Sequence, residues 1–395
     1  MSSPTPSGPR RRPRDRRQQI VAAAAELFWQ RGFGQVGVVD VAAAVDIGHS
    51  ALYRHFRSKV DLLIAVVDEA LNREEAAFDA TDGPEGTLHE LVRIGIQSRE
   101  YVAVWHRDVL EVPREQLGNR SSRRTELVAR AGAMAAGAGP DPAGIATLRA
   151  DAALAVIESA GRHHIKMDVG TDVGLLTGAA RAVLEAPLPT DAAALATGRE
   201  QPSSLLLPAA RREALLAVAG RLFAERGYDA VSLNEIGAEL GIAGPSIYNH
   251  FPGKLDLLTA ILQRGNENLW FTLHRVLAES TRPEGAIARL LDNYIEVVGG
   301  PPRVVSVLIN EVENLPPDLR HSYRVGQRAY LDEWVALLCA WRPSVDERSA
   351  RLLILATFAA VAALHRDPGR PAPHPDLVYA LTAPVLGLPP RSPAV

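Results

Sequence analysis

One segment of this chain occurs twice, and the repeat limits the folds open to it. Residues 36–63, VGVVDVAAAVDIGHSALYRHFRSKVDLL, align without a gap with residues 231–258, VSLNEIGAELGIAGPSIYNHFPGKLDLL, after a shift of 195 positions. A period near half of the 395 residues indicates a duplicated domain, because solenoid repeats are much shorter. Aromatic residues are few, at 5%, and long alternating β-branched runs are absent, so an all-α fold is favoured.

Each copy predicts short helices followed by a long one. In the first copy we expect helices at about 15–30, 38–44 and 49–55, with a tight turn at 46–48. Ser58 followed by Asp61 has the pattern of a capping box, which would open a long helix through about residue 77. Two short helices joined by a tight turn are typical of the helix-turn-helix, whose second helix enters the DNA major groove.

The second short helix carries side chains that suit a DNA groove. Leu52 and Phe56 are four residues apart and are expected on its buried side, which leaves five residues facing outward: His49, Ser50, Tyr53, Arg54 and His55. Such groups can bond base edges or phosphates, and Lys59 can hold a phosphate at the start of the next helix. The alternative is that Tyr53 and His55 close the small core. We favour contact with a DNA groove over a role in the core, because this set of residues recurs in the same order 195 residues later.

The charge distribution points to the first half as the dominant contact to a polyanion. Six of residues 10–17, RRRPRDRR, are Arg, although the net charge of the chain is −3. We expect residues 1–13 to be a disordered basic arm, either a solubilising tail or, as we favour, an arm on the phosphate backbone or in the minor groove. Residues 13–61 carry seven Lys or Arg against five Asp or Glu, whereas residues 208–256 carry five against six.

These residues also resemble a known family. Leu27-Phe28, Gly32-Phe33, Val41-Ala42 and the run 52–56 with Lys59 resemble the DNA-binding head of TetR-type transcriptional regulators, and 241–251 of the second copy is closer still. The resemblance implies DNA contacts by the Tyr, the His and the Lys of each motif, by the residue after the Tyr and by the residue four before it. With the basic arm and its neighbours, the expected contacts are Arg14, Arg16, Arg17, His49, Ser50, Tyr53, Arg54, His55, Lys59, Ser232, Gly244, Pro245, Ser246, Tyr248, Asn249, His250 and Lys254.

Several positions depart from the family pattern, among them the Ser before the recognition helix, which is Gly48 in one copy and Ala243 in the other. Gly37 stands where the family usually has Thr or Ser to cap the second helix, whereas the second copy keeps Ser232. Asp46 replaces a turn Gly. Gly244 has no side chain to offer a base, so we expect the second head to position the protein more than it reads sequence, and Pro245 suits a helix start.

The duplication continues beyond the DNA-binding heads into the helical bodies that follow them. Residues 105–109, WHRDV, match residues 308–312, LINEV. We divide the chain into a basic arm (1–13), a first head (14–61), a first helical body (62–185), a linker (186–208) whose Leu205–Leu207 pack back onto one half, a second head (209–256), a second body (257–387) and a tail (388–395). In TetR-type proteins the middle helices enclose a ligand pocket and the last two form a four-helix bundle between protomers. Here the late helices 147–166 and 172–185 correspond to 344–366 and 375–386, so the resemblance implies a pseudo-dimer within one chain.

Polar residues in the bodies are open to several interpretations. A metal site at His106 or His163-His164 lacks a spaced carboxylate or thiolate partner, so a polar spot in an apolar cavity, or a surface or core position, is favoured. Tryptophans on helices are more often packing than pocket. The candidate ligand residues are Trp105, His106, Arg107, His163, His164, Asn310, Glu311, Trp334 and Phe358, and no metal is expected.

The function we expect is a sequence-specific DNA-binding regulator, a repressor relieved by a small apolar ligand, with operator DNA as partner and no cofactor. The whole-chain pattern resembles actinobacterial double TetR regulators of lipid-import (mammalian-cell-entry) operons, which implies a lipid, sterol or acyl thioester effector. In the alternative function, only the first head reads DNA, and the second half is a module for dimerisation and for sensing the ligand. An enzyme lacks a persuasive catalytic motif, and a DNA-compacting protein disagrees with the low net charge. We expect a cytoplasmic protein without membrane spans, a lone buried Cys339, and either one chain or a homodimer of chains.

Overall fold

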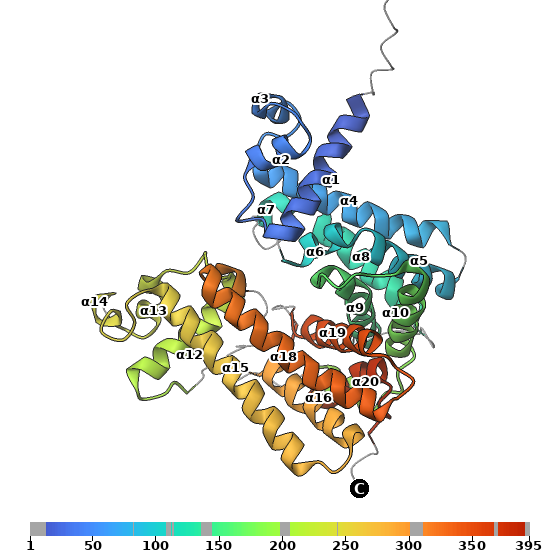
Figure 1. Ribbon diagram of the computed structural model, residues 1–395, viewed down its shortest axis with the longest axis vertical. Helices are drawn as coiled ribbons and strands as arrows, with labels where there is room; N and C mark the ends of the chain where they lie inside the picture. The colour runs from blue at the N-terminus through green and yellow to red at the C-terminus, as the bar shows by residue number, and fades with distance from the viewer. Residues whose placement is uncertain are drawn as a thin grey trace, which may run out of the picture.

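The computed structural model describes residues 13–81, 83–107, 112, 114–135, 144–197, 206–242, 244–300, 311–366 and 370–391. Within these ranges every regular element is a helix (Figure 1). The first half of the chain forms the upper part of Figure 1, the second half forms the lower part, and the two heads lie apart from each other on the side away from α10 and α20.

The first head consists of three helices: α1 (Pro13–Arg31), α2 (Val38–Ala44) and α3 (His49–Tyr53). The apolar stripe of α1, with Ile20, Ala24 and Phe28, packs against Leu52 and Phe56 in one buried cluster. The prediction for α2 is confirmed to the residue, and α3 ends two residues earlier than predicted.

The second head repeats this arrangement with α12 (Arg211–Arg226), α13 (Leu233–Glu239) and α14 (Gly244–Ile247). The first helix of each head stops at a glycine, Gly32 or Gly227, that adopts φ of 85° or 80°. This part of backbone space is open to glycine and strained for other residues, so the same stop signal acts in both copies.

The first body is a set of helices that follow the first head: α4 (Lys59–Ala80), α5 (Pro84–Gln97), α6 (Arg99–Arg107), α7 (Arg114–Leu117), α8 (Arg120–Gly132), α9 (Ile145–Glu158), the 3₁₀ helix η2 (Ser159–Arg162) and α10 (Val169–Leu184). Ser58 accepts a hydrogen bond from the Asp61 amide at 3.0 Å, so the predicted cap opens α4. Arginines of α8 pair with acids of α4, among them Arg123 with Glu75 and Arg130 with Asp79.

The second body repeats the plan with α15 (Lys254–Glu279), α16 (Pro283–Gly299), η3 (Val312–Asn314), α18 (Pro317–Trp341), α19 (Glu347–Leu364) and α20 (Pro375–Leu386). Here α15 and α18 meet through aromatic rings and a hydrogen bond. Trp270 of α15 lies edge-on to Tyr330 of α18 at 5.9 Å, and the Tyr323 hydroxyl of α18 donates to the Thr259 carbonyl oxygen of α15 at 3.1 Å. The two bodies therefore share an architecture, while aromatic side chains are prominent at this contact of the second.

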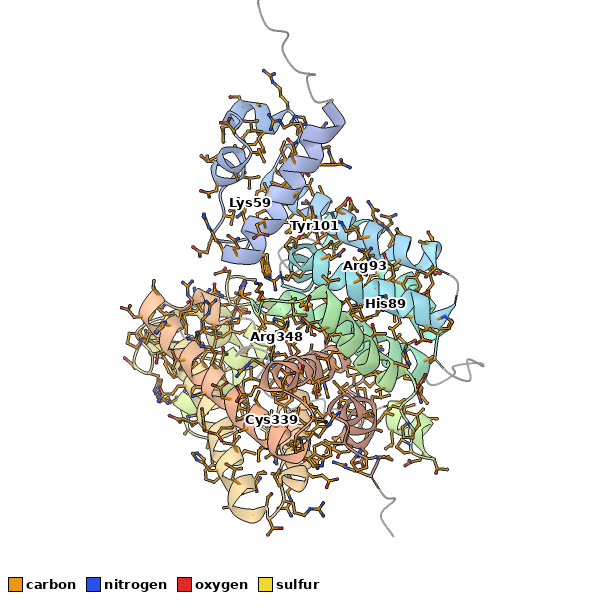
Figure 2. All side chains as sticks on the ribbon, turned by 45° about the vertical axis from the view of Figure 1, so that its right-hand side comes forward. Lys59, His89, Arg93, Tyr101, Cys339 and Arg348 are labelled. Carbon is orange, nitrogen blue, oxygen red and sulfur yellow. The ribbon has the colours of Figure 1, made fainter. Side chains whose placement is uncertain are left out.

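The late helices of the two halves pack against each other. α9 contacts α19, and α10 contacts both α19 and α20. Ala155 of α9 joins Ala359 and Ala363 of α19 in one small buried cluster, because small side chains let the two backbones approach closely. Arg348 of α19 reaches Asp172 of α10 in an ion pair that joins residues 176 positions apart, and Figure 2 shows Arg348 at the boundary between the halves.

Several sequence expectations differ from the structure. The helix predicted to reach residue 166 ends at Glu158 and η2, and His163 is extended, because α6 packs so closely on Gly161 that a Cβ there would lie 2.7 Å from the Arg99 carbonyl oxygen. Leu206 is fully exposed and Leu207 is 45% exposed, so they do not pack back onto the body, and Leu205 lies outside the described residues. The linker contains a helix, α11 (Ala192–Ala196), which contacts α20. Leu388 is buried, so packing continues past the predicted boundary at 387, and Cys339 is only half-buried.

Candidate nucleic-acid interface

The recognition helix α3 presents one polar face to solvent. Leu52 is 1% exposed and anchors the helix in the head, whereas His49, Ser50, Arg54 and His55 are exposed. Tyr53 is 43% exposed although it is a large aromatic residue, and its ring stands edge-on to that of His49 at 4.7 Å. An aromatic residue left in water beside basic groups has the chemistry of a contact to sugar or phosphate.

The second recognition helix, α14, has the same polarity. Ile247 is fully buried, whereas Tyr248 is 58% exposed and Asn249 is exposed. Ser246 and His250 are half-buried, and the side chains at 244 and 245 lie outside the described residues. Asn249 takes the position of Arg54, so the outward face offers an amide in place of a guanidinium.

Two cation–aromatic contacts recur in both heads. The Arg17 guanidinium lies 4.8 Å above the Phe56 ring, and Arg212 lies 4.8 Å above Phe251. The ammonium of Lys59 lies 4.1 Å from the centre of the Phe33 ring, as Lys254 does from that of Tyr228. The two heads are therefore the same unit in geometry, although 195 residues separate them.

Three residues predicted to contact DNA are also tied to their own head. Lys254 donates hydrogen bonds to the carbonyl oxygens of Tyr228 and Val231 at 2.8 and 2.9 Å, so its ammonium braces the loop before α13. Ser232 caps α13 and bonds Glu235, whose pKa is lowered to about 2 by Arg226 and by these Ser232 hydrogen bonds. Arg16 donates to the Val45 carbonyl oxygen at 3.0 Å, and the side chain of Arg14 lies outside the described residues.

The turn between α2 and α3 contains a strained residue. Asp46 adopts φ of 53°, in the left-handed region where side chains other than Gly are disfavoured, and its counterpart Gly241 adopts φ of 63°. The Asp noted in the sequence as a departure thus keeps the backbone shape of a glycine.

Replacing Asp46 by Gly is therefore expected to raise the stability of the first head by about 0.5–1 kcal/mol, because the left-handed backbone no longer opposes a Cβ. Urea unfolding followed by circular dichroism measures the change. Gly241→Asp in the second head is the matched reverse substitution and should lower stability by a similar amount. A destabilising Asp46→Gly would contradict this account of the turn.

Both heads match one family model. The model for bacterial regulatory proteins of the tetR family matches residues 20–66 and again residues 215–261. The chain carries the DNA-binding head of the TetR family twice. The matched segments contain both helix-turn-helix units, and the shift between them is the 195 positions found in the sequence, so the expected all-α fold of two tandem TetR-like units is confirmed.

Curated transcriptional regulators match a part of this chain. The transcriptional activator FasR of Mycolicibacterium smegmatis is 39% identical over 88 residues, which are 22% of this chain and 40% of FasR. The transcriptional repressor KstR2 of Rhodococcus jostii is 28% identical over 113 residues, 29% of this chain and 55% of KstR2. The chain thus spans about half the length of the curated relatives it matches.

Solved TetR-family structures match about half of this chain. KstR2 of Mycobacterium tuberculosis, described as a ketosteroid transcriptional regulator, gives a TM-score of 0.41 at 22% identity and covers 49% of this chain and 98% of its own. AibR, solved in complex with isovaleryl coenzyme A and operator DNA, gives 0.40 at 22% identity and covers 46% of this chain and 100% of its own.

The predicted ligand residues fall into separate groups. His163 and His164 follow η2 in the first half. Neither ring nitrogen of His163 has a hydrogen-bond partner, and burial lowers its pKa to about 4, so the ring is neutral at pH 7. His164 is exposed and packs against Trp29, with 4.5 Å between ring centres. The side chains of residues 105–107, and Asn310 as a whole, lie outside the described residues.

The other candidates lie in the second TetR body. Trp334 is fully buried and stands edge-on to Phe358 at 5.1 Å, and Phe358 stacks on Tyr294 at 4.2 Å. Glu311 is buried and accepts a hydrogen bond from the Asn314 side chain at 2.7 Å. These rings form a packed aromatic cluster, as expected of tryptophan on a helix.

Sequence reasoning missed Trp29, which joins the first TetR head to its body. Its indole N–H donates to the Gly161 carbonyl oxygen at 2.9 Å, and the Arg99 guanidinium lies 4.4 Å above its ring. The alignment of the two copies places Trp29 at the position of Ala224. This difference in side-chain size was the sequence signal that Trp29 makes a contact found in the first half alone.

One surface cleft lies away from the predicted ligand residues. A surface cleft of about 350 Å³ lies between the end of α15, the start of α16 and α20, and Arg282, Arg289 and Tyr379 are among its lining residues. None of the predicted ligand residues lines it. The part of the chain that the structure describes holds no group of three His, Cys, Asp or Glu side chains placed to bind a metal, and no helix in it is long and apolar enough to cross a membrane.

Proposed function

We propose that this chain is a sequence-specific DNA-binding transcriptional regulator whose two TetR heads contact one operator. The observation that carries the proposal is the pair of recognition helices, each anchored by one buried residue, Leu52 or Ile247, with an exposed Tyr next to it. Sequence reading would fall to Arg54 in the first head and Asn249 in the second. Guanidinium groups favour guanine and amides favour adenine in the major groove.

The two halves would act as the two protomers of a pseudo-dimer. Packing of α9 on α19 and of α10 on α20 supports this arrangement, as does the ion pair of Arg348 with the buried Asp172 carboxylate. Because one polypeptide carries both heads, the second head binds intramolecularly once the first is bound, which raises affinity without association of two chains. A small apolar effector, lipid-like as the family resemblance implies, would favour a head arrangement that no longer fits successive grooves.

We propose repression as the direction of regulation. The names of the KstR2 relatives describe repressors, whereas FasR is named an activator. A reporter placed behind the DNA upstream of this gene should therefore be more active in a strain that lacks the protein. Lower reporter activity in that strain would assign activation instead.

The DNA-binding proposal is tested with fragments from the gene's own upstream region. Arg54→Ala and Asn249→Ala should each weaken specific binding by about 1–3 kcal/mol, the usual range for one lost base contact. Fluorescence anisotropy at two salt concentrations measures both affinity and its salt slope. Arg57→Ala is the control, because Arg57 is also an exposed arginine but lies beyond the buried Phe56, outside the run 49–55 that is predicted to face the groove.

The outcomes separate the candidate mechanisms. Loss of affinity from both substitutions supports two reading heads. Loss from Arg54→Ala alone supports the alternative in which the first head reads DNA and the second half dimerises and senses, which the higher positive charge of the first head favours. Failure of the wild type to bind any upstream fragment would contradict the regulator.

A further inference from the structure

Residues 161–166, which we call the connector segment, lie between α9 and α10 of the first half. The segment begins in η2 and continues in extended conformation, with His163 at φ of −142° and ψ of 160°. The η2 helix packs against α6 of the first half and also against α19 of the second half. The connector segment therefore starts where the two halves of the chain meet.

The first head contacts the connector segment through Trp29, near the end of α1. The Trp29 indole N–H donates to the Gly161 carbonyl oxygen at 2.9 Å, and its ring packs against that of His164 with 4.5 Å between the centres. Figure 1 shows α1 descending from the top of the first half toward the second half. One side chain of the head thus binds the segment at two points, and both the hydrogen bond and the ring contact depend on its orientation.

Arg99 of α6 joins Trp29 to the middle of the connector segment. Its guanidinium lies 4.4 Å above the Trp29 ring, and its Nη1 donates to the Ile165 carbonyl oxygen at 2.8 Å. A planar guanidinium can stack on a ring and donate hydrogen bonds in its own plane at the same time, so the two contacts restrict each other. Trp29, Arg99 and the segment therefore hold one another in a single arrangement.

The second half binds the same segment through Arg348 of α19. Nη2 of Arg348 donates to the Lys166 carbonyl oxygen at 2.8 Å, and Nη1 donates to Asp172 of α10 at 2.7 Å. Arg99 and Arg348 thus bind the carbonyl groups of two consecutive residues, although one arginine comes from the first half and the other from the second. The first head and α19 are therefore both attached to the connector segment.

The second head cannot repeat the contact that Trp29 makes. The shift of 195 positions places Ala224 of α12 at the position of Trp29. A methyl side chain has no hydrogen-bond donor and no ring to stack on another. The two heads therefore share their own geometry but differ in the chemistry with which this part of their first helix meets the rest of the chain.

We propose that the connector segment fixes the orientation of the first head relative to the second half. Trp29 is the positioning residue on the side of the head, and Arg348 is the positioning residue on the side of α19. The consequence for DNA rests on the proposed function, because two heads on one chain engage one operator together only when their relative orientation fits both half-sites. The connector segment then sets the spacing of half-sites that the chain accepts.

Distances between two spin labels in the full chain test the proposal without DNA. In a Cys339→Ser background, labels at Arg57→Cys in the first head and Ala336→Cys on α18 occupy exposed positions. Double electron–electron resonance then reports where the first head lies relative to the second half, and the chain with Trp29 should give one narrow distance distribution. Trp29→Ala should broaden that distribution or shift its peak, under conditions where circular dichroism shows the variant to be folded.

Matched variants separate positioning from a loss of stability. Phe78→Ala removes another ring with a guanidinium above it, that of Arg130 at 4.6 Å, at the end of α4 opposite the first head. It should lower the free energy of unfolding and leave the distance distribution narrow. Arg348→Ala should broaden the distribution because it releases Lys166, whereas Arg351→Ala on the same helix should not.

Two milder variants keep the test decisive if Trp29→Ala does not fold. Trp29→Phe keeps a ring beneath Arg99 but loses the donor to Gly161, and Arg99→Met releases both the ring and Ile165. Each should broaden the distribution, Trp29→Phe by less than Trp29→Ala where both can be measured. An unchanged distribution in the folded variants of Trp29 and Arg99, or equal broadening by Phe78→Ala, would overturn the proposal.

Operator binding gives a second measurement that a purely structural role of Trp29 would not change. One base pair inserted between the half-sites moves one of them by about 3.4 Å and rotates it by about a tenth of a turn. Wild type should bind this fragment about tenfold more weakly or worse, because both heads must engage at once. Trp29→Ala should lose clearly less affinity on insertion and bind a single half-site as wild type does.

The two measurements keep this proposal distinct from the proposed function. Equal dependence on half-site spacing in wild type and Trp29→Ala would contradict the role of the connector segment in operator choice. A wild type that binds no operator, but whose label distances depend on Trp29 and Arg348, would reject the regulator and keep the connector segment.

Discussion

Replacing Trp29 by Ala is expected to lower the free energy of unfolding by about 3–5 kcal/mol, the range for removal of a buried aromatic side chain. Trp29 is 8% exposed, donates to the Gly161 carbonyl oxygen and packs between Arg99 and His164. The substitution leaves a cavity and an unsatisfied carbonyl oxygen where α1 meets η2. Urea unfolding followed by circular dichroism gives the change without relying on tryptophan fluorescence.

Two further variants give stability changes to compare with that of Trp29→Ala. Trp29→Phe keeps much of the ring packing and loses the hydrogen bond, so a smaller loss of about 1–2 kcal/mol is expected. Phe271→Ala removes an aromatic side chain that is 69% exposed on α15, and its effect should stay within about 0.5 kcal/mol. A loss below 1 kcal/mol for Trp29→Ala would mean that the first head is held without this contact.

Replacing Arg348 by Ala is expected to cost about 2–3 kcal/mol. The buried Asp172 carboxylate, only 2% exposed, receives Nη1 of Arg348 at 2.7 Å and also the Asp168 amide at 2.6 Å. Loss of one partner from a buried pair leaves a desolvated charge, and the partial exposure of Arg348 places the effect at the lower end of that class. Urea unfolding of the full chain measures it, and the loss reports on contact between the halves.

The matched control is Arg351→Ala on the same helix, which breaks a more exposed pair with Asp332 and should change stability by about 0.5 kcal/mol or less. The double variant Asp172→Asn with Arg348→Met removes both charges and keeps a side-chain oxygen that can accept the Asp168 amide. Its stability should be higher than that of Arg348→Ala, because no buried charge is left alone. A double variant as unstable as Arg348→Ala would show that the ion pair itself, and not relief of the lone carboxylate, holds the halves together.

The sequence by itself determined the elements and the heads. The range 38–44 for α2, the Ser58 cap of α4 and the glycine stops at 32 and 227 depend on interactions within a few residues, so periodicity and capping patterns were sufficient to find them. The burial of Leu52 and the exposure of Tyr53 follow from the spacing of the recognition helix, and the repeat indicated that both belong to a conserved plan within this one chain. Such features depend on interactions between residues that are close together in the chain, so a short stretch of sequence is enough to predict them.

The tertiary structure decided what depends on neighbours far along the chain. The end of α9 at Glu158 is set by α6 packing on Gly161, Lys254 turns inward to carbonyl oxygens of its own head, and Leu206 stays in water although it is apolar. Asp172 and Arg348 meet across 176 positions because α10 packs against α19. The physical reason is that the energy of a charge or an aromatic ring depends on the groups and the water around it, and only the folded chain specifies those surroundings.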